Sequence, residues 1–291
     1  MKLTIFTPTY NRAYIIEQLY RSLQRQTCYD FEWLVVDDGS VDDTKSVFAK
    51  WVEEEKRFPI RYYQKENGGK HCAINRGLDL AQGELFYIVD SDDYLADDAV
   101  EKIIRWSDEA TREATYCGFA GNMDSVPQGA MNRKFDGGYF DGTALDRYGI
   151  VDGERAMVFY TDIHRKYYYP EFDNEKFITE AVVWNRMAAD GYRIRYYNDI
   201  ICLFEYQEDG LTKAGNRLFL NNPRGYGLWL CEKAKFQKIG IIGRLKMYYT
   251  FTCDLFGKYT GKQIAEYIGA PHCLISIYGC MRKLIGWIRK S

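Results

Sequence analysis

The sequence lacks any run of about 18 uncharged apolar residues, so nothing in it predicts a helix that crosses a membrane. Its eight cysteines are scattered, without a Cys-x-x-Cys pair or the spacing of a zinc site, which predicts reduced thiols. Met1 and Lys2 lead directly into an apolar strand pattern rather than a signal peptide, and no internal repeat follows. We therefore expect a globular protein of the cytoplasm.

Composition supports a folded chain with an unusually aromatic surface or core. The 291 residues are 46% hydrophobic and 27% charged, as in folded globular proteins, and can form one large domain plus an appendage. Aromatic residues reach 16%, with 25 tyrosines. This content suits surfaces that meet sugars or a membrane interface, and core packing is the alternative.

Charge is distributed unevenly along the chain. The net charge is −2, but residues 238–291 carry nine Lys and Arg against Asp254 and Glu266, which makes this region +7 and the remainder −9. An asymmetry of this kind indicates a C-terminal region with its own binding partner.

Hydrophobic periodicity predicts an α/β protein with a largely parallel sheet, because strands alternate with helices and the connections are too long for hairpins. The predicted strands are 2–7 (ended by Pro8), 32–36, 60–64, 85–89, 116–120, 158–164 and 192–196. The predicted helices are 13–26, 40–55, 70–81, 97–111, 177–189, 223–237, 241–256, 262–268 and 272–290.

The stretch Asp90-Ser91-Asp92-Asp93 follows the apolar strand 85–89 directly. Open α/β sheets bind ligands at the carboxyl ends of their strands, and three carboxylates placed there repel one another. A Mg²⁺ or Mn²⁺ ion shared with a phosphate would relieve that repulsion. The alternative is a helix N-cap followed by an acidic first turn.

Two other strands end in polar tips that a parallel sheet brings to the same edge. The first ends in Thr7-Pro8-Thr9-Tyr10-Asn11-Arg12 and the second in Asp37-Asp38-Gly39-Ser40. A carboxylate such as Asp38 can accept a hydrogen bond from a nucleotide base, and Tyr10 can stack on it. Capping by Asp38 and local packing by Tyr10 are the alternatives.

These tips, together with Asn67-Gly68-Gly69-Lys70-His71-Cys72-Ala73-Ile74-Asn75-Arg76-Gly77 and Gly83-Glu84, occur in the order and separation typical of one family. Over about residues 2–210 the chain resembles the family 2 glycosyltransferases of the GT-A fold. The resemblance implies an inverting transferase that uses a nucleotide-diphosphate sugar, commonly UDP, with Mn²⁺ or Mg²⁺. It also implies a catalytic domain over 1–212, with a nucleotide-sugar half (1–121) and an acceptor half (122–212), followed by a helical region over 213–291.

Residue by residue, the resemblance implies a nucleotide pocket, a base contact and a metal site. Thr7, Pro8 and Tyr10 would line the pocket, and Asp38 would bind the base. Asp92 would ligate the metal with Asp93 beside it, while Asp90 would support the ribose or the waters on the metal. Lys70, at a glycine-rich helix start, would reach a phosphate; a solvated surface lysine is the alternative.

Inversion requires a base that takes the proton of the acceptor hydroxyl. The family supplies it from a Glu-Asp pair that opens a helix, and here the matching position holds Glu180 followed by Ala181. Glu180 is therefore the predicted base, with Asp173 and Glu175 as competitors and a dipole-favoured helix-start glutamate as the alternative. Trp184, one turn later, would stack on the acceptor sugar or pack in the core.

The C-terminal region interleaves basic residues with apolar and aromatic ones. Over residues 240–290 this pattern predicts amphipathic helices that contact a membrane surface, which makes the protein peripheral at the inner face of the cell membrane. A packed helical subdomain or a homodimer interface is the alternative. Nucleic acid is not expected as a partner, because phosphates do not need the thick apolar faces.

The function predicted from the sequence is sugar transfer to a saccharide or lipid-linked acceptor in surface polysaccharide or glycan biosynthesis. A non-catalytic nucleotide-sugar or glycan-binding scaffold is the alternative from another class. A nucleotidyltransferase would carry a glycine-rich basic loop after its first strand, and Thr7-Pro8-Thr9-Tyr10 differs from that pattern.

Overall fold

The computed structural model describes residues 1–110, 115–126, 129–130, 134–147, 150–151, 153–205, 207, 213 and 215–288. The chain forms two compact units. The first unit comprises Met1–Tyr169 and Arg186–Gly210, and the second comprises Pro170–Asn185 and Leu211–Ser291. The second unit thus takes in a segment that we placed in the catalytic domain. The predicted boundary after residue 212, which lies outside the described residues, stays a prediction.

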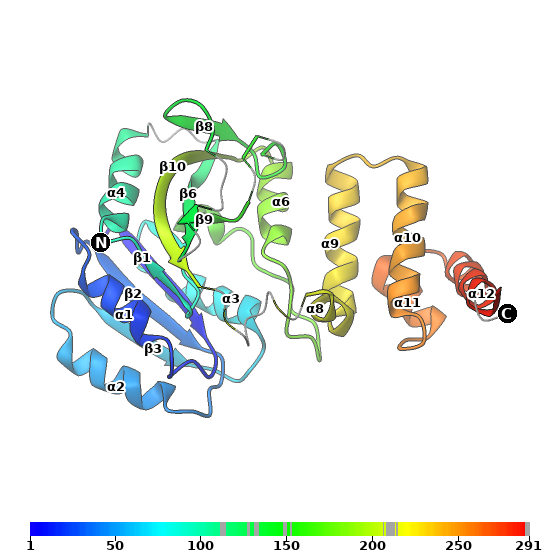
Figure 1. The fold of residues 1–291 in the computed structure, drawn as a ribbon, viewed down its shortest axis with the longest axis horizontal. Helices are drawn as coiled ribbons and strands as arrows, with labels where there is room; N and C mark the ends of the chain where they lie inside the picture. The colour runs from blue at the N-terminus through cyan, green and yellow to red at the C-terminus, as the bar shows by residue number, and fades with distance from the viewer. Residues whose placement is uncertain are drawn as a thin grey trace. The chain divides into compact units, whose positions relative to one another are not determined.

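A mixed, mostly parallel sheet forms the centre of the first unit, in the order β3-β2-β1-β4-β9-β6-β10-β5 (Figure 1). Four parallel strands make one half, and in the other half β9 runs antiparallel between β4 and β6. This arrangement confirms the α/β class and the GT-A type of sheet. The strands are β1 Leu3–Thr9, β2 Phe31–Asp37, β3 Ile60–Gln64, β4 Leu85–Ile88, β5 Asp93–Leu95, β6 Tyr116–Ser125, β7 Gly129–Ala130, β8 Tyr139–Gly142, β9 Arg155–Tyr160 and β10 Arg193–Phe204.

Strand β1 continues through Pro8, which corrects the prediction that proline ends it. Thr9 pairs toward β2, because its carbonyl accepts from the Asp38 amide at 2.8 Å. The backbone of Pro8 therefore faces β4, whose pairing with β1 has already ended at Phe6 and Ile88. A missing N–H costs nothing where no partner strand accepts it.

The strand predicted over 158–164 is also corrected, because β9 ends at Tyr160 and Thr161–His164 forms the short helix α5. The Thr161 hydroxyl donates to the Gly83 carbonyl at 2.7 Å, and its amide donates to the Glu84 carbonyl at 2.9 Å. These bonds turn the chain out of the sheet. His164 is then fully buried against the rings of Phe86 and Phe159.

Helices cover both faces of the parallel strands. Trp33 on β2 stacks with Tyr20 of α1 and packs on Phe48 of α2, whereas Gly77 of α3 lies against the ring of Phe6 on the opposite face. A Cβ at Gly77 would lie 2.3 Å from that ring, so only glycine allows this approach. The helices are α1 Glu17–Gln24, α2 Thr44–Glu54, α3 Lys70–Leu80 and α4 Ala99–Glu109. Helix α6 (Ala181–Ala189) is divided between the units.

The second unit is helical, as predicted for the C-terminal region. Its core consists of apolar side chains from three helices, including Phe251, Leu255, Ile264, Ile268 and Ile275. Its helices are α8 Asn216–Asn221, α9 Pro223–Phe236, α10 Ile241–Leu255, α11 Gly261–Ile268 and α12 His272–Ile288. Among the described residues, no helix is long and apolar enough to cross a membrane.

Candidate active site

The predicted polar tips meet at the carboxyl edge of the parallel strands, because β1 pairs with β2 on one side and β4 on the other. The Asp38 amide donates to the Thr9 carbonyl at 2.8 Å, and the Val89 amide donates to the Phe6 carbonyl at 2.9 Å. Asp38 and Asp90 therefore emerge from the two strands that flank β1. The edge is the position at which open α/β sheets bind ligands.

Asp38 is 4% exposed and is held by the loop that precedes α3. Its carboxylate accepts from the amides of Gly68 and Gly69 at 2.9 and 2.7 Å and pairs with the Lys65 ammonium at 2.8 Å. Gly39 makes this approach possible, since its φ is +85° and a Cβ would lie 3.0 Å from the Asn67 nitrogen. The predicted base-binding carboxylate is thus fixed in orientation.

Lys70, the first residue of α3, forms an ion pair with Asp90, with its Nζ 2.6 Å from Oδ1 and 2.9 Å from Oδ2. Lys70 therefore points along the sheet edge rather than being a solvated surface lysine. Because Lys65 holds Asp38 and Lys70 holds Asp90, the segment 65–70 connects the two strand tips. The predicted nucleotide residues Asp38, Lys70 and Asp90 are brought together in one arrangement.

Asp92 and Asp93 lie in the turn after β4 and at the start of β5, where the Asp93 amide donates to the Asp90 carbonyl at 3.1 Å. Burial, followed by the negative charge of Asp90, raises the pKa of Asp92 above its usual range. Burial and the charges of Asp90 and Asp92 likewise raise the pKa of Asp93. The described part of the chain holds no cluster of three or more His, Cys, Asp or Glu side chains arranged to bind a metal. Any ion here would rely on one or two of these carboxylates together with phosphate oxygens.

The residues at the end of β1 differ in their exposure. Tyr10 is 48% exposed, Pro8 is buried, and Thr7 is fully buried. The Thr7 hydroxyl accepts from the Trp33 indole nitrogen at 3.0 Å, so it lies inside the sheet layer behind the edge. Of these three predicted pocket residues, Tyr10 is the one that presents a large ring surface.

Our sequence analysis missed three contributors to this edge. Lys65 pairs with Asp38, and the Tyr62 hydroxyl donates to Asp37. The positive charge of Arg12 offsets part of the rise in the pKa of Asp92 that burial causes. Arg12 stood in a motif that we quoted, but nothing in its spacing indicated a role. Lys65 directly follows β3, just as the acidic residues directly follow β2 and β4. This position at a strand end is the signal from which its role could have been predicted.

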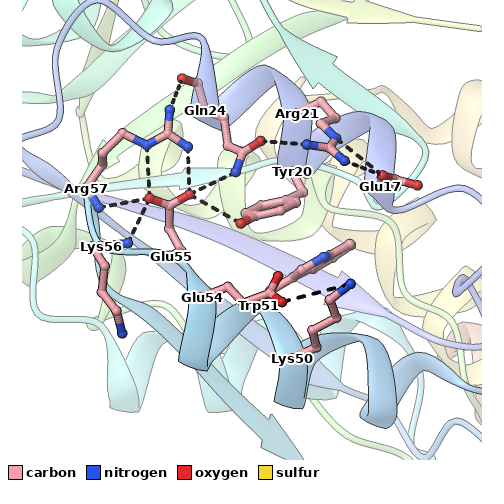
Figure 2. A pocket seen from close by; sticks show the side chains of 10 residues that line it. All are labelled: Glu17, Tyr20, Arg21, Gln24, Lys50, Trp51, Glu54, Glu55, Lys56 and Arg57. Carbon is pink, nitrogen blue, oxygen red and sulfur yellow. Dashed lines mark hydrogen bonds and ion pairs between the residues drawn. The ribbon is translucent and has the colours of Figure 1, made fainter.

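A separate pocket of about 360 Å³ lies between α1 and α2 (Figure 2). In it, Arg57 faces Glu55 at 2.8 Å, Gln24 donates to the same carboxylate, and Tyr20 stacks on Trp51. None of the predicted nucleotide or metal residues lines it. Glu55 and Arg57 precede the amino end of β3, so this pocket lies away from the carboxyl edge of the sheet.

The predicted base, Glu180, immediately precedes α6, and its carbonyl accepts from the amides of Val183 and Trp184 at 3.1 and 3.3 Å. Its competitor Glu175 has another task, because its carboxylate accepts from the amides of Arg224 and Gly225 at 2.7 and 2.9 Å. Glu175 therefore caps the amino end of α9, where a negative charge is favourable. This geometry favours Glu180 over Glu175 as the base.

The segment that carries Glu180 is joined to helix α9 by further contacts within the second unit. The Lys176 amide donates to Asn222 Oδ1 at 2.7 Å, and a Cβ at Gly225 would lie 2.8 Å from the Ile178 side chain. Trp184 is half-buried, and its indole nitrogen lacks a hydrogen-bond acceptor among the described residues. This nitrogen is itself buried, so Trp184 offers ring surface rather than a hydrogen-bond donor to a ligand.

The family model for Glycosyl transferase family 2 matches residues 4–185, which is more than half of the chain and includes both the strand-tip edge and Glu180. The chain belongs to glycosyl transferase family 2. It is 29% identical over 281 residues to the GalNAc(5)-diNAcBac-PP-undecaprenol beta-1,3-glucosyltransferase of Campylobacter jejuni, covering 94% of this chain and 87% of the relative. It is also 34% identical over 129 residues to the chondroitin synthase of Pasteurella multocida, covering 44% of this chain and 13% of that protein.

Solved structures share the fold. The crystal structure of S. aureus TarS 1–349 in complex with UDP-GlcNAc has a TM-score of 0.66 at 19% identity and covers 87% of this chain and 80% of that one. The mannosyltransferase PcManGT from Pyrobaculum calidifontis, in complex with GDP-Man and Mn²⁺, has a TM-score of 0.53 at 20% identity and covers 97% and 87%. The family 2 member described here is a glycosyltransferase of glycan biosynthesis with a GT-A fold.

Proposed function

We propose that this enzyme is a metal-dependent, inverting glycosyltransferase that moves a hexosyl group from a nucleotide-diphosphate sugar, with UDP-sugar favoured, to a saccharide or lipid-linked acceptor. The observation that carries the proposal is the segment 65–70, which holds Asp38 at one end and Asp90 at the other beside Asp92. The complex of TarS with UDP-GlcNAc supports the donor class, and the undecaprenol-linked substrate named for the Campylobacter relative supports the acceptor class.

The nucleotide would bind across the tips of β1 and β2. Tyr10 offers an exposed ring for stacking, and Asp38, already oriented by two amides and Lys65, offers a carboxylate oxygen to a base N–H. Lys70 would exchange its ion pair with Asp90 for a phosphate oxygen, which leaves Asp90 to accept from the ribose or from waters on the metal. Each of these groups comes from a different part of the strand-tip edge.

The donor set at Asp92 and Asp93 fits a hard divalent cation. Burial and the negative charge of Asp90 raise the pKa of both carboxyls, so a positive charge beside them would be favourable. Carboxylates that share the ion with phosphate oxygens are the ligands that Mg²⁺ and Mn²⁺ prefer. When bound, such an ion supplies positive charge against the diphosphate as it leaves.

Glu180 would take the proton of the acceptor hydroxyl as that oxygen attacks the anomeric carbon and the bond to the diphosphate breaks. Glu175 is engaged at the amino end of α9, which removes it as a competitor of Glu180. Trp184 would contact the acceptor sugar through its ring. The Glu-Ala sequence would thus use one carboxylate in place of the Glu-Asp pair that the resemblance to the family implies.

An enzyme with a lipid-linked acceptor would act at the cytoplasmic face of the membrane, as a peripheral protein that contacts lipid through residues 240–290. The excess of basic residues in this region supports that placement. Homodimerisation through the same helices is the competing use of their apolar faces, and nucleic acid is not an expected partner.

The decisive experiment measures turnover of a panel of nucleotide sugars with Mn²⁺, with and without acceptor, for the native chain and Glu180→Gln. We expect transfer with inversion at the anomeric carbon, and a loss of about 10²–10⁴-fold in transfer by Glu180→Gln with UDP affinity unchanged. Glu175→Gln serves as the matched control, because it should lower stability more than kcat. A chain that binds UDP-sugar but transfers nothing to any acceptor would instead indicate the glycan-binding scaffold.

A further inference from the structure

The hairpin of α9 and α10 exposes apolar side chains at its turn. The two helices run antiparallel next to each other within the second unit and are joined by residues 237–240 (Figure 1). Ile241 and Ile242, which open α10, are 71% and 80% exposed. At the other end of the same helix, Phe251 and Leu255 are fully buried in the helical core. The first turn of α10 therefore carries large apolar groups that the fold does not use.

The charged residues next to these isoleucines in the sequence are all basic. We define the hairpin tip as residues 235–246. Its exposed charged side chains are Lys235, Lys238, Arg244 and Lys246. No Asp or Glu occurs between Glu232 and Asp254 in the sequence. The tip thus combines exposed apolar groups with four positive charges in twelve consecutive residues.

The backbone of the tip is held in a defined turn. Lys238 adopts a positive φ of 52°, the Ile239 amide donates to the Ala234 carbonyl at 2.9 Å, and Arg244 Nε donates to the Ile239 carbonyl at 3.2 Å. Two isoleucines presented on an ordered helix start lose little further backbone freedom when they bind a surface.

Charge decides which surface fits the tip. Two copies meeting tip to tip would bring eight cations together with no carboxylate within either tip to pair them, which opposes a dimer at this site. Nucleic acid phosphates would satisfy the cations but leave the isoleucines in water. An anionic lipid bilayer accepts both, since apolar side chains enter the acyl boundary while Lys and Arg pair with headgroups.

We propose that the hairpin tip inserts Ile241 and Ile242 into an anionic membrane surface and holds there through its lysines and arginine. This inference deepens the proposed function and rests on it, because an enzyme with a lipid-linked acceptor works at a bilayer. The exposed apolar residues of α12, Ile277 and Met281 (56% and 45% exposed), lie at the end of a stretch, 263–281, that contains no Lys or Arg and is followed by Arg282 and Lys283. They are assigned no part in this attachment, which narrows the lipid contact proposed for residues 240–290 to the hairpin tip.

The test is co-sedimentation of the full chain with vesicles of phosphatidylcholine alone or with about a third phosphatidylglycerol. We expect binding to the anionic vesicles that weakens with salt. The double variant Ile241→Ser, Ile242→Ser should lose more than about tenfold in affinity. Lys238→Gln with Lys246→Gln should lose about fivefold for each lysine removed.

The matched control is Ile277→Ser with Met281→Ser, which removes two less exposed apolar groups from α12 and should bind like the native chain. Equal binding to neutral vesicles, native affinity in the Ile241/Ile242 variant, or an equal loss in the α12 control would each overturn the proposal. Thermal melting by circular dichroism verifies that the variants fold. Donor turnover with a soluble acceptor separates the two proposals, because it should survive the tip variants and vanish only if the proposed chemistry is wrong.

Discussion

Two sets of carboxylates within the first unit differ in whether their neighbours compensate or oppose their negative charge. Near the amino ends of the strands, Glu32 is fully buried and is matched by Arg61, the Thr4 hydroxyl and the Gln82 amide. Glu55 is matched by Arg57, Gln24 and Tyr20. At the carboxyl edge, burial and neighbouring negative charge act on Asp92 and Asp93.

The pKa directions express this difference. Burial alone would raise the pKa of Glu55, but hydrogen bonds from Arg57 and Gln24 outweigh it and lower the pKa to about 2. The pKa of Asp92 is raised, because Arg12 and Lys70 offset its burial and the charge of Asp90 only in part. The charges of Glu32 and Glu55 are compensated by side chains of the protein itself. The charges of Asp92 and Asp93 are compensated only in part, so a bound cation would complete the compensation.

The largest expected effect comes from removing the edge charge. Asp92→Asn should lower turnover of the nucleotide sugar with Mn²⁺ by at least about 100-fold, since a bound ion contributes several kcal/mol to the transition state. The same variant should match or exceed the native melting temperature, because it removes a partly buried, repelled charge. Steady-state kinetics and thermal melting check both halves, and native turnover in this variant would reassign the metal ligand.

A stability loss without an activity loss is expected at the opposite end of the strands. Glu55→Gln leaves Arg57 without its carboxylate, so the free energy of unfolding should fall by about 1–3 kcal/mol while turnover stays native. Urea denaturation monitored by circular dichroism measures the change. The control is Glu54→Gln, whose exposed carboxylate pairs with Lys50 at 3.9 Å and should change stability by less than about 0.5 kcal/mol.

The sequence predicted those features of the carboxyl edge that depend on neighbouring residues, and it missed those that depend on contacts between residues far apart in the chain. The apolar strands, their polar tips and the glycine-rich start of α3 can be recognised from short windows, and the parallel pairing then places Asp38 and Asp90 on one edge. The pairing of Lys65 with Asp38 depends on the register of β2 and β3 and on the left-handed Gly39, which no short window reveals. A short window also fails to reveal the capping of α9 by Glu175, because Glu175 is 49 and 50 positions from its partners Arg224 and Gly225.

The second half of the sheet was predicted less well for a related reason. β9 enters antiparallel between β4 and β6, and β10 continues through register shifts to Phe204. Its apolar pattern past Tyr196 is interrupted by Asn198 and Asp199, where one of these shifts occurs. Tertiary pairing extends the strand beyond the point where local periodicity ends.

The pH dependence of stability should separate the two carboxylate sets by sign. The lowered pKa of Glu55 contributes stability that is present above its unfolded value near 4.5 and is lost as the pH falls toward about 2. The raised pKa of Asp92 does the reverse, since ionisation is penalised in the fold at neutral pH and the penalty disappears on acidification.

Melting temperatures of the native chain and both variants, measured from pH 7 to pH 3 without metal, test this directly. The advantage of Asp92→Asn over the native chain should shrink as the pH falls. The deficit of Glu55→Gln should persist to about pH 4.5 and shrink only below it. Parallel curves for all three proteins would contradict the comparison.

The smallest expected effect comes from removing Lys65. This lysine pairs with Asp38 at the carboxyl edge, much as Arg57 pairs with Glu55 at the other end of the strands. If Asp38 binds the base, Lys65→Met should weaken uridine and UDP equally, by about threefold, because a partly exposed ion pair contributes about 0.7 kcal/mol. Asp92→Asn should weaken only UDP with Mn²⁺. Calorimetric titration of both ligands distinguishes the two, with Lys50→Met as the control. A loss confined to UDP in Lys65→Met would place this lysine on the phosphate side and remove Asp38 from base recognition.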